Sequence, residues 1–228
     1  HLADYTIPAE VLAVKIKEKF PLVEPSRFSI DSKAAGDLFV RICGILEMAD
    51  NGVAESVRQI GDAVRNNAID TGKLFPAFLG EDESLFESLE KEFKMDPAVL
   101  TFVVYNSLKP SLAKFAEMVS GHLDREEEWD KGYCPVCGSR PELSIFEENG
   151  RRSLLCGFCG HRWRSKRVFC PFCENTDHET LRYYEVEDEE EYRVDVCDRC
   201  KGFIKTVDIK KLSRPLYLPL ECITTPYI

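Results

Sequence analysis

The sequence lacks a hydrophobic run long enough to cross a membrane. One of its longest apolar stretches, Val99 to Tyr105, is far shorter than the ~20 residues that a transmembrane helix requires. No positively charged segment is followed by an apolar one, as in a secretory leader. We therefore expect a cytoplasmic protein without membrane insertion. The hydrophobic fraction of 44% over 228 residues is ordinary for a globular chain, and the length suggests two domains.

The sequence is also short of positive charge. Its 30 Lys and Arg residues against 40 Asp and Glu residues give a net charge of -10, which disfavours general nucleic-acid binding. A local exception is the basic cluster, which comprises Arg151, Arg152, Arg162, Arg164, Lys166 and Arg167. This cluster would suit an acidic partner surface or a phosphate. Alternatively, it is a solvated face that the acidic run from Glu187 to Glu191 partly neutralises.

Cysteine is scarce in the first half of the chain and abundant in the second. Residues 1–122 contain Cys43 alone, which we interpret as a small residue of a helical core. Four Cys-x-x-Cys pairs follow: Cys134 and Cys137, Cys156 and Cys159, Cys170 and Cys173, and Cys197 and Cys200. Two such pairs complete a tetrahedral site with metal–sulfur bonds of about 2.3 Å. Cys222 is left over, and we expect it to bind no metal.

The spacing of the pairs predicts which of them share an ion. The first two pairs, and likewise the last two, are far enough apart to enclose a β-hairpin, whereas the second and third are close. The predicted sites are therefore Cys134, Cys137, Cys156 and Cys159, and Cys170, Cys173, Cys197 and Cys200. Interleaved sites, disulfides and a thioredoxin-like redox pair stay open as alternatives. Gly138 and Gly160 each follow a pair, where positive φ lets backbone N–H groups point at the sulfurs.

Familiar catalytic motifs are missing. We find no Ser-His-Asp order, phosphate-binding loop or Glu-His metal motif. A closed site of four cysteines also leaves no open position for a substrate. We therefore expect a protein that is not an enzyme.

The first 122 residues carry helical periodicity. We predict a first helix that begins near Pro8 and four further helices, which cover residues 34–49, 53–69, 85–93 and 98–122. The last of these has the strongest start signal, because Asp96 is a good N-cap and Pro97 suits the first turn. Pro110 should kink or divide it near Leu108. The segment around Phe75 and Pro76 is predicted to be irregular.

Short β-like segments follow, each close to a cysteine pair. They cover residues 143–146, 153–155, 181–186, 192–196 and 203–207. Modules this small bury too little surface to fold unaided, so metal should supply much of their stability. We predict an α+β fold, with an N-terminal helical bundle followed by two small rubredoxin-like or zinc-ribbon β modules. The predicted bounds are 1–122 for the bundle, 123–132 for a charged linker, 133–168 and 169–210 for the modules, and 211–228 for a tail.

The second half resembles a known family. The relevant segments are Tyr133-Cys-Pro-Val-Cys-Gly-Ser-Arg-Pro141, Gly150-Arg-Arg-Ser-Leu-Leu-Cys156, Cys159 with Trp163 and Arg167, the two later pairs, and Lys205-Thr-Val-Asp208. Together they resemble the FdhE family of formate dehydrogenase accessory proteins. The resemblance covers about residues 133–208. Arg162 departs from it, because the family more often has an acidic residue before the tryptophan.

The resemblance implies an assembly factor that binds the catalytic subunit of formate dehydrogenase during maturation and does not itself oxidise formate. It also implies rubredoxin-like iron at four-cysteine sites, for which the matching ligand positions here are the eight paired cysteines. The residues themselves leave iron and zinc open as the two bound ions. The alternative function is that of a zinc-ribbon protein that binds nucleic acid or transcription proteins through the basic cluster.

Overall fold

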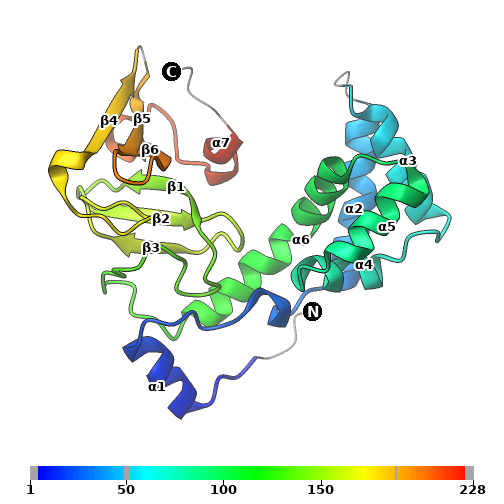
Figure 1. Cartoon of the computed structure of the whole chain (residues 1–228), viewed down its shortest axis with the longest axis horizontal. Coiled ribbons are helices and arrows are strands. Elements are labelled where there is room, and N and C mark those ends of the chain that lie inside the picture. Colours follow the sequence, from blue (N-terminus) through cyan, green and yellow to red (C-terminus); the bar gives the residue numbers. More distant parts are fainter. Residues whose placement is uncertain (1–4, 49–51, 188, 224–228) are drawn as a thin grey trace. The chain divides into compact units, whose positions relative to one another are not determined.

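The computed structural model describes residues 5–48, 52–187 and 189–223 (Figure 1). These residues form seven α-helices and one six-stranded sheet, which confirms the predicted α+β fold. Two compact units divide them. The helical unit contains residues 23–115 and the residues before Ile7, and the sheet unit contains Ile7–Leu22 and residues from Ala116 onward. None of the helices in the described ranges has both the length and the apolarity needed to span a bilayer.

The helical unit is a bundle in which four of the five helices named next begin at an aspartate cap, whereas α3 follows Val53 without a side-chain cap. Its elements are α2 (Ser32–Glu47), α3 (Ala54–Arg65), α4 (Thr71–Leu79), α5 (Glu83–Phe93) and the first part of α6 (Pro97–Ser120). The carboxylate of Asp96 accepts the Ala98 N–H at 2.8 Å, so the predicted cap of α6 is confirmed. The largest fully buried side chains of this unit include Phe39, Ile60, Phe75, Leu108, Leu112 and Phe115.

Two helices continue through prolines at which we expected an irregular, kinked or divided segment. Residues 71–79 form α4 although Pro76 lies inside it. The side chain of Asp70 caps the helix by accepting the Gly72 N–H at 2.8 Å, and burial of Leu74 and Phe75 outweighs the hydrogen bond that the proline removes. Likewise, Pro110 does not divide α6, which runs unbroken through it.

The sheet unit carries its six strands in the order β3-β2-β1-β6-β5-β4. The strands are β1 (Pro141–Phe146), β2 (Arg152–Cys156), β3 (Arg162–Ser165), β4 (Leu181–Val186), β5 (Glu189–Cys197) and β6 (Phe203–Asp208). Five of these overlap the predicted β-like segments, and β4 has the predicted bounds. We did not predict β3, because Arg162-Trp-Arg-Ser165 shows little of the apolar content that identifies a strand.

The two predicted modules are continuous with each other in this sheet. Strands β1 to β3 form one antiparallel set and β4 to β6 another. A parallel pair joins them, with Ser144 of β1 beside Thr206 of β6. The sheet unit is therefore a single layer of backbone hydrogen bonds that links both cysteine-rich halves.

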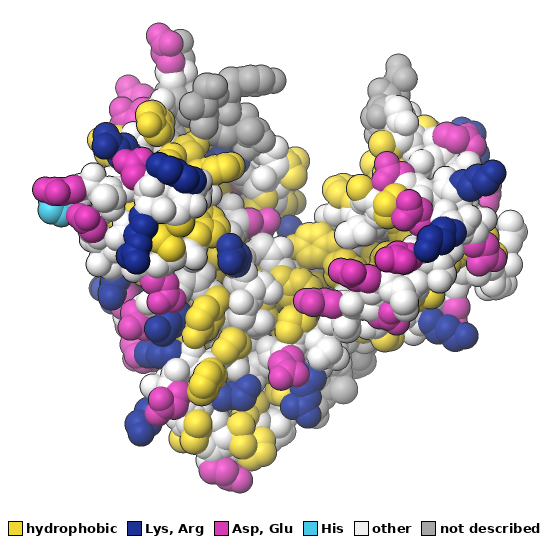
Figure 2. All heavy atoms as spheres, viewed as in Figure 1, with side chains coloured by type: hydrophobic (Ala, Val, Ile, Leu, Met, Phe, Trp, Pro, Cys, Tyr) yellow, Lys and Arg dark blue, Asp and Glu magenta, His cyan; other side chains and the backbone are white. Residues whose placement is uncertain are grey.

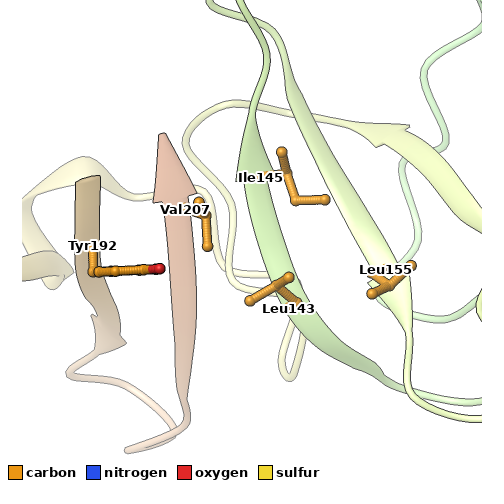
Figure 3. Close-up of a cluster of buried hydrophobic side chains, with 5 residues drawn as sticks. All are labelled: Leu143, Ile145, Leu155, Tyr192 and Val207. Atoms are coloured by element: carbon orange, nitrogen blue, oxygen red, sulfur yellow. The ribbon is translucent and has the colours of Figure 1, made fainter. Parts of the chain in front are cut away.

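One face of the sheet carries its apolar core. Figure 3 shows Leu143, Ile145, Leu155, Tyr192 and Val207 along neighbouring strands. The end of the chain covers them through Ile209, Leu212, Leu216, Leu218 and Cys222. We predicted a tail over residues 211–228, and its described part, residues 211–223, thus contributes to the core of the unit.

A buried carboxylate fastens α7 (Leu218–Ile223) to this face. Glu221 is fully buried and accepts hydrogen bonds from the Tyr192 hydroxyl at 2.9 Å and from Arg214 at 2.7 Å. The Lys205 ammonium donates to the Glu221 carbonyl oxygen. Burial raises the pKa of Tyr192 to about 12, which keeps on the phenol the proton that it donates.

Helix α1 (Ala9–Lys17) groups with the sheet unit, although it lies within residues 1–122, the range that we predicted for the bundle. The segment after it contacts the first cysteine turn, because the Tyr133 hydroxyl donates to the Lys19 carbonyl at 2.8 Å and the Leu22 N–H donates to the Pro135 carbonyl at 2.9 Å. The predicted linker is also held, since the Trp129 N–H donates to the Arg164 carbonyl at 2.9 Å. The domain bounds predicted from the sequence stay a proposal.

Candidate metal centres

The structure gathers the eight paired cysteines into two groups of four. Site one contains Cys134, Cys137, Cys156 and Cys159, and site two contains Cys170, Cys173, Cys197 and Cys200. Within each group all four sulfurs lie within 4.8 Å of one another. This grouping is the one predicted from the spacing, and it excludes the interleaved arrangement. Metal binding by these sulfurs stays a prediction. The distances between them show whether a tetrahedral ion would fit.

The sulfur separations fit a tetrahedral ion. Four sulfurs at about 2.3 Å from a common centre lie roughly 3.8 Å apart. In site one the Sγ–Sγ distances are 3.8 Å between Cys134 and Cys159 and 3.4 Å between Cys137 and Cys156. In site two the corresponding distances, from Cys170 to Cys200 and from Cys173 to Cys197, are 3.6 and 3.7 Å. Sulfurs joined in a disulfide would be about 2.05 Å apart, so these cysteines are free thiols.

All four pairs adopt the same tight turn. In site one the N–H groups of Gly138 and Gly160 donate back to the carbonyls of Cys134 and Cys156, at 2.8 and 3.2 Å. Both glycines have positive φ, as predicted, with values of 79° and 69°. The turn brings the two sulfurs of each pair to one side of the backbone.

Site two builds this turn without glycine. The N–H groups of Glu174 and Lys201 donate to the carbonyls of Cys170 and Cys197, both at 2.8 Å. These two residues have φ of 60° and 61°, a conformation that side chains rarely adopt. Because neither residue is a glycine, the positive φ of these two turns could not be predicted from the sequence. The backbone at Glu174 and Lys201 thus adopts the conformation of Gly138 and Gly160 despite the strain, and this places the sulfurs of site two as in site one.

Further donors point at individual sulfurs. In site one the N–H groups of Phe158 and Cys159 approach the Cys156 sulfur at 3.3 and 3.4 Å. In site two the Gly202 N–H lies 3.4 Å from the Cys200 sulfur, and the Asn175 amide lies 3.6 Å from that of Cys197. Such donors stabilise a thiolate more than a thiol, so they favour the ligand form of the cysteines.

The electrostatics of the sites also call for a cation. Burial raises the pKa of the Cys134 thiol well above its ordinary value, and it raises that of Cys170 to about 12. Four thiols this close cannot all ionise unless positive charge lies between them, and a bound transition-metal ion supplies it. At both sites the four cysteines therefore fit a metal ion that is bound by four thiolates.

The two sites differ in their access to water. All four cysteines of site one are buried. In site two Cys170 and Cys197 are buried, Cys173 is partly exposed and Cys200 is exposed. A chelator should therefore reach an ion at site two more easily than an ion at site one.

Two glycine substitutions separate backbone strain from crowding at site one. At Gly160 an added Cβ has no neighbour within 4 Å, so Gly160→Ala should cost about 1 kcal/mol, from its positive φ alone. At Gly138 the Cβ would lie 3.0 Å from the Pro21 side chain, so Gly138→Ala should cost about 2 kcal/mol. Chemical denaturation of both variants measures the difference. Equal losses of stability in the two variants would show that the Pro21 side chain moves aside without a measurable cost.

Three of the six residues of the basic cluster lie beside carboxylates. Arg151 binds the Glu126 carboxylate at 2.6 Å, Arg162 lies 3.8 Å from that of Glu147, and the buried Arg152 lies 3.4 Å from Asp195. Burial lowers the pKa of Arg152, which remains a cation beside this carboxylate. These partners lie outside the 187–191 acidic run considered in the sequence. Side chains of both signs are interspersed on the face seen in Figure 2.

Other residues noted in the sequence have structural contacts. Cys43 is fully buried in α2, and the Cys222 thiol lies 3.2 Å from the Glu142 carboxylate, so neither belongs to a cysteine group. Trp163 is buried and stacks on His161, with ring centroids 6.5 Å apart. The Trp129 indole N–H donates to the Tyr133 carbonyl at 2.9 Å. Both tryptophans therefore pack against the first module.

Comparisons with known proteins point to one family. The family model described as "FdhE, central domain" matches residues 133–167, a range that includes every ligand position of site one. An FdhE homolog of Aquifex aeolicus is 32% identical over 117 residues, which are 50% of this chain and 40% of that protein. FdhE of Escherichia coli K12 is 31% identical over 106 residues, 45% of this chain and 34% of that protein. The second half of this chain is thus similar to FdhE proteins.

A solved structure extends the FdhE likeness to the whole fold. The crystal structure of FdhE from Pseudomonas aeruginosa matches with a TM-score of 0.60 and 21% identity, over 92% of this chain and 70% of that one. At this identity the match shows a shared fold. The segments aligned with the Aquifex and Escherichia proteins span less than half of their length. Site two lies beyond the range of the FdhE central-domain model.

Proposed function

We propose that this chain is a metal-binding accessory protein that binds the catalytic subunit of formate dehydrogenase during its maturation. The observation that carries the proposal is the pair of four-sulfur sites in a chain that is similar to FdhE. The eight cysteines would hold two ions, iron or zinc. Each ion would cross-link two turns and, if iron, would add one-electron chemistry.

The proposed role is that of a binding protein rather than an enzyme, located in the cytoplasm. All four ligand positions at each ion would be taken by sulfur, so none is open to a substrate. What the sites would supply is rigidity. The bound ions would fix the ends of β2 and β5, at Cys156 and Cys197, and with them the loops through which the sheet unit would present a surface to its partner.

The test is retention of the named partner by the full chain. An affinity-tagged chain, produced in a bacterium that makes formate dehydrogenase, should retain the catalytic subunit after nuclease treatment and a high-salt wash. The same purification with Cys134→Ser should lose it, because the sheet unit depends on site one, whereas Cys222→Ser should keep it. If the catalytic subunit is absent from eluates of fully metallated protein, the proposal is wrong.

The same preparation tests the alternative, a zinc-ribbon protein that binds nucleic acid. That function predicts nucleic-acid affinity that falls steeply with salt. The pairing of Arg151, Arg152 and Arg162 with carboxylates argues against it, because these guanidinium groups are already neutralised within the chain.

A further inference from the structure

A cavity of about 260 Å³ lies in the sheet unit, on the face opposite the apolar core. Side chains alternate along a strand, so Tyr192 on the core face places its neighbour Arg193 on the other face. Arg193 pairs with Thr206, which in turn lies beside Ser144. Strands from both modules therefore supply this second face. The cavity is called the arginine pocket here, after its lining residues Arg152, Arg167, Arg182 and Arg193.

Positive charge exceeds negative charge around the arginine pocket. Asp195 is the one carboxylate among the described lining residues. It is already shared, because Arg193 lies 2.9 Å and Arg152 3.4 Å from its oxygens, and Thr206 donates to it at 2.5 Å. Arg152 also donates to the Ser144 hydroxyl at 2.8 Å and to the Phe169 carbonyl at 2.7 Å. This buried arginine is thus a fixed part of the wall.

Arg193 is held in place yet incompletely bonded. Its guanidinium lies between two aromatic rings, 4.4 Å from the Phe146 centroid and 4.7 Å from that of Tyr183. One terminal nitrogen binds Asp195, but the Nε atom is buried without a hydrogen-bond partner. A buried N–H of this kind is costly, since it has lost water and gained no acceptor. A ligand oxygen entering the pocket would supply one.

Arg167 adds a second, more accessible cation at the pocket. It is exposed, and one of its terminal nitrogens donates to the Gly150 carbonyl at 3.1 Å. Its guanidinium also lies 5.1 Å from the centroid of the Phe146 ring, the same ring that contacts Arg193. The remaining walls are largely apolar and include Phe169, Pro171, Phe172, Leu181, Val196 and Ile204.

We propose that the arginine pocket binds a carboxylate carried on an apolar stem. The carboxylate would accept hydrogen bonds from the Nε atom of Arg193 and from Arg167, and the stem would lie against the apolar wall. The volume suits a single side chain or a small organic acid better than a larger ligand. An acidic side chain of a partner polypeptide and a free acid share this chemistry.

Calorimetric titration of the full-length metallated protein tests the proposal with four probes. Phenylacetate should bind at least about tenfold more tightly than neutral phenylacetamide and more tightly than inorganic phosphate. A capped Leu-Glu-Leu peptide identifies the source of the carboxylate. Tighter binding than phenylacetate points to a polypeptide partner, and weaker binding points to a free acid. Equal affinity for phenylacetate and phenylacetamide, or preference for phosphate, would overturn the proposal.

Variants assign the site. Arg193→Gln and Arg167→Gln should each weaken phenylacetate binding about tenfold. Arg125→Gln removes the same charge from an exposed position of the sheet unit away from the pocket and should leave the affinity unchanged. Arg167→Gln keeps the test decisive if Arg193→Gln destabilises the fold, because Arg167 is exposed. Equal weakening by Arg125→Gln and Arg167→Gln would reduce the effect to net charge and contradict the assignment.

Discussion

Replacing Cys134 with serine is expected to unfold the sheet unit while α2 to α5 keep their helical structure. Cys134 is fully buried at the centre of site one, and its loss leaves three thiols that cannot close a tetrahedral shell. Structural zinc contributes about 10 kcal/mol to small domains, more than the apolar cluster of this sheet can replace. The helical unit has its own core of buried phenylalanine and leucine side chains, so it should be spared.

Amide hydrogen exchange on the full chain measures this outcome strand by strand. In the variant, the six strands of the sheet should lose protection, while the helices of the bundle retain theirs. The parent protein should contain two ions per chain by elemental analysis, and its visible absorption would distinguish ferric iron from colourless zinc. Cys222→Ser is the matched control, since Cys222 lies outside both groups and should leave the ion content at two. Protected strands in a Cys134→Ser protein that has lost the ion of site one would refute the proposed structural role.

Gly132→Ala should be the most damaging of the glycine substitutions. A Cβ atom on Gly132 would lie 2.1 Å from the carbonyl oxygen of Pro171, which is backbone and cannot rotate away. The Gly132 N–H also donates to the Glu174 carboxylate at 3.2 Å. We expect a loss of about 3 kcal/mol in the free energy of unfolding, at the upper end for steric overpacking.

Because Pro171 follows the ligand Cys170, the same change should loosen site two. The rate at which a chelator removes metal therefore serves as a second measurement, expected to rise for the ion at site two alone. Gly121→Ala is a suitable control, since its added Cβ meets its nearest neighbour, the Met118 carbonyl, at an ordinary 3.4 Å. A melting temperature for Gly132→Ala that equals that of Gly121→Ala would show that the linker is not clamped against the second module.

Local spacing explains why the grouping of the cysteines could be predicted. A Cys-x-x-Cys pair fixes its own turn within five residues, and the hairpin-length gaps between pairs leave few ways to combine them. The start of α6 was predictable for the same reason, because its Asp96 cap acts on the adjacent turn. The strained turns at Glu174 and Lys201 were not, since neither side chain signals positive φ.

Contacts between distant segments had no comparable signal. Nothing in the short strands β1 and β6 indicates that they pair in parallel, and nothing in α1 indicates that the residues after it contact the first cysteine turn. The importance of Gly132 is also non-local, because it depends on the backbone at Pro171. Likewise, Arg152 looked like a surface cation in the sequence, and the sheet pairs it with Asp195 inside the protein.

The parallel pair between β1 and β6 has a consequence for biosynthesis. While the chain leaves the ribosome, β1 must wait for the last strand to be made, so one of its edges stays open. All four thiols of site one emerge well before that strand. Early ion capture there would hold the nascent hairpin in register and limit the time in which an unpaired edge can associate with a neighbouring polypeptide.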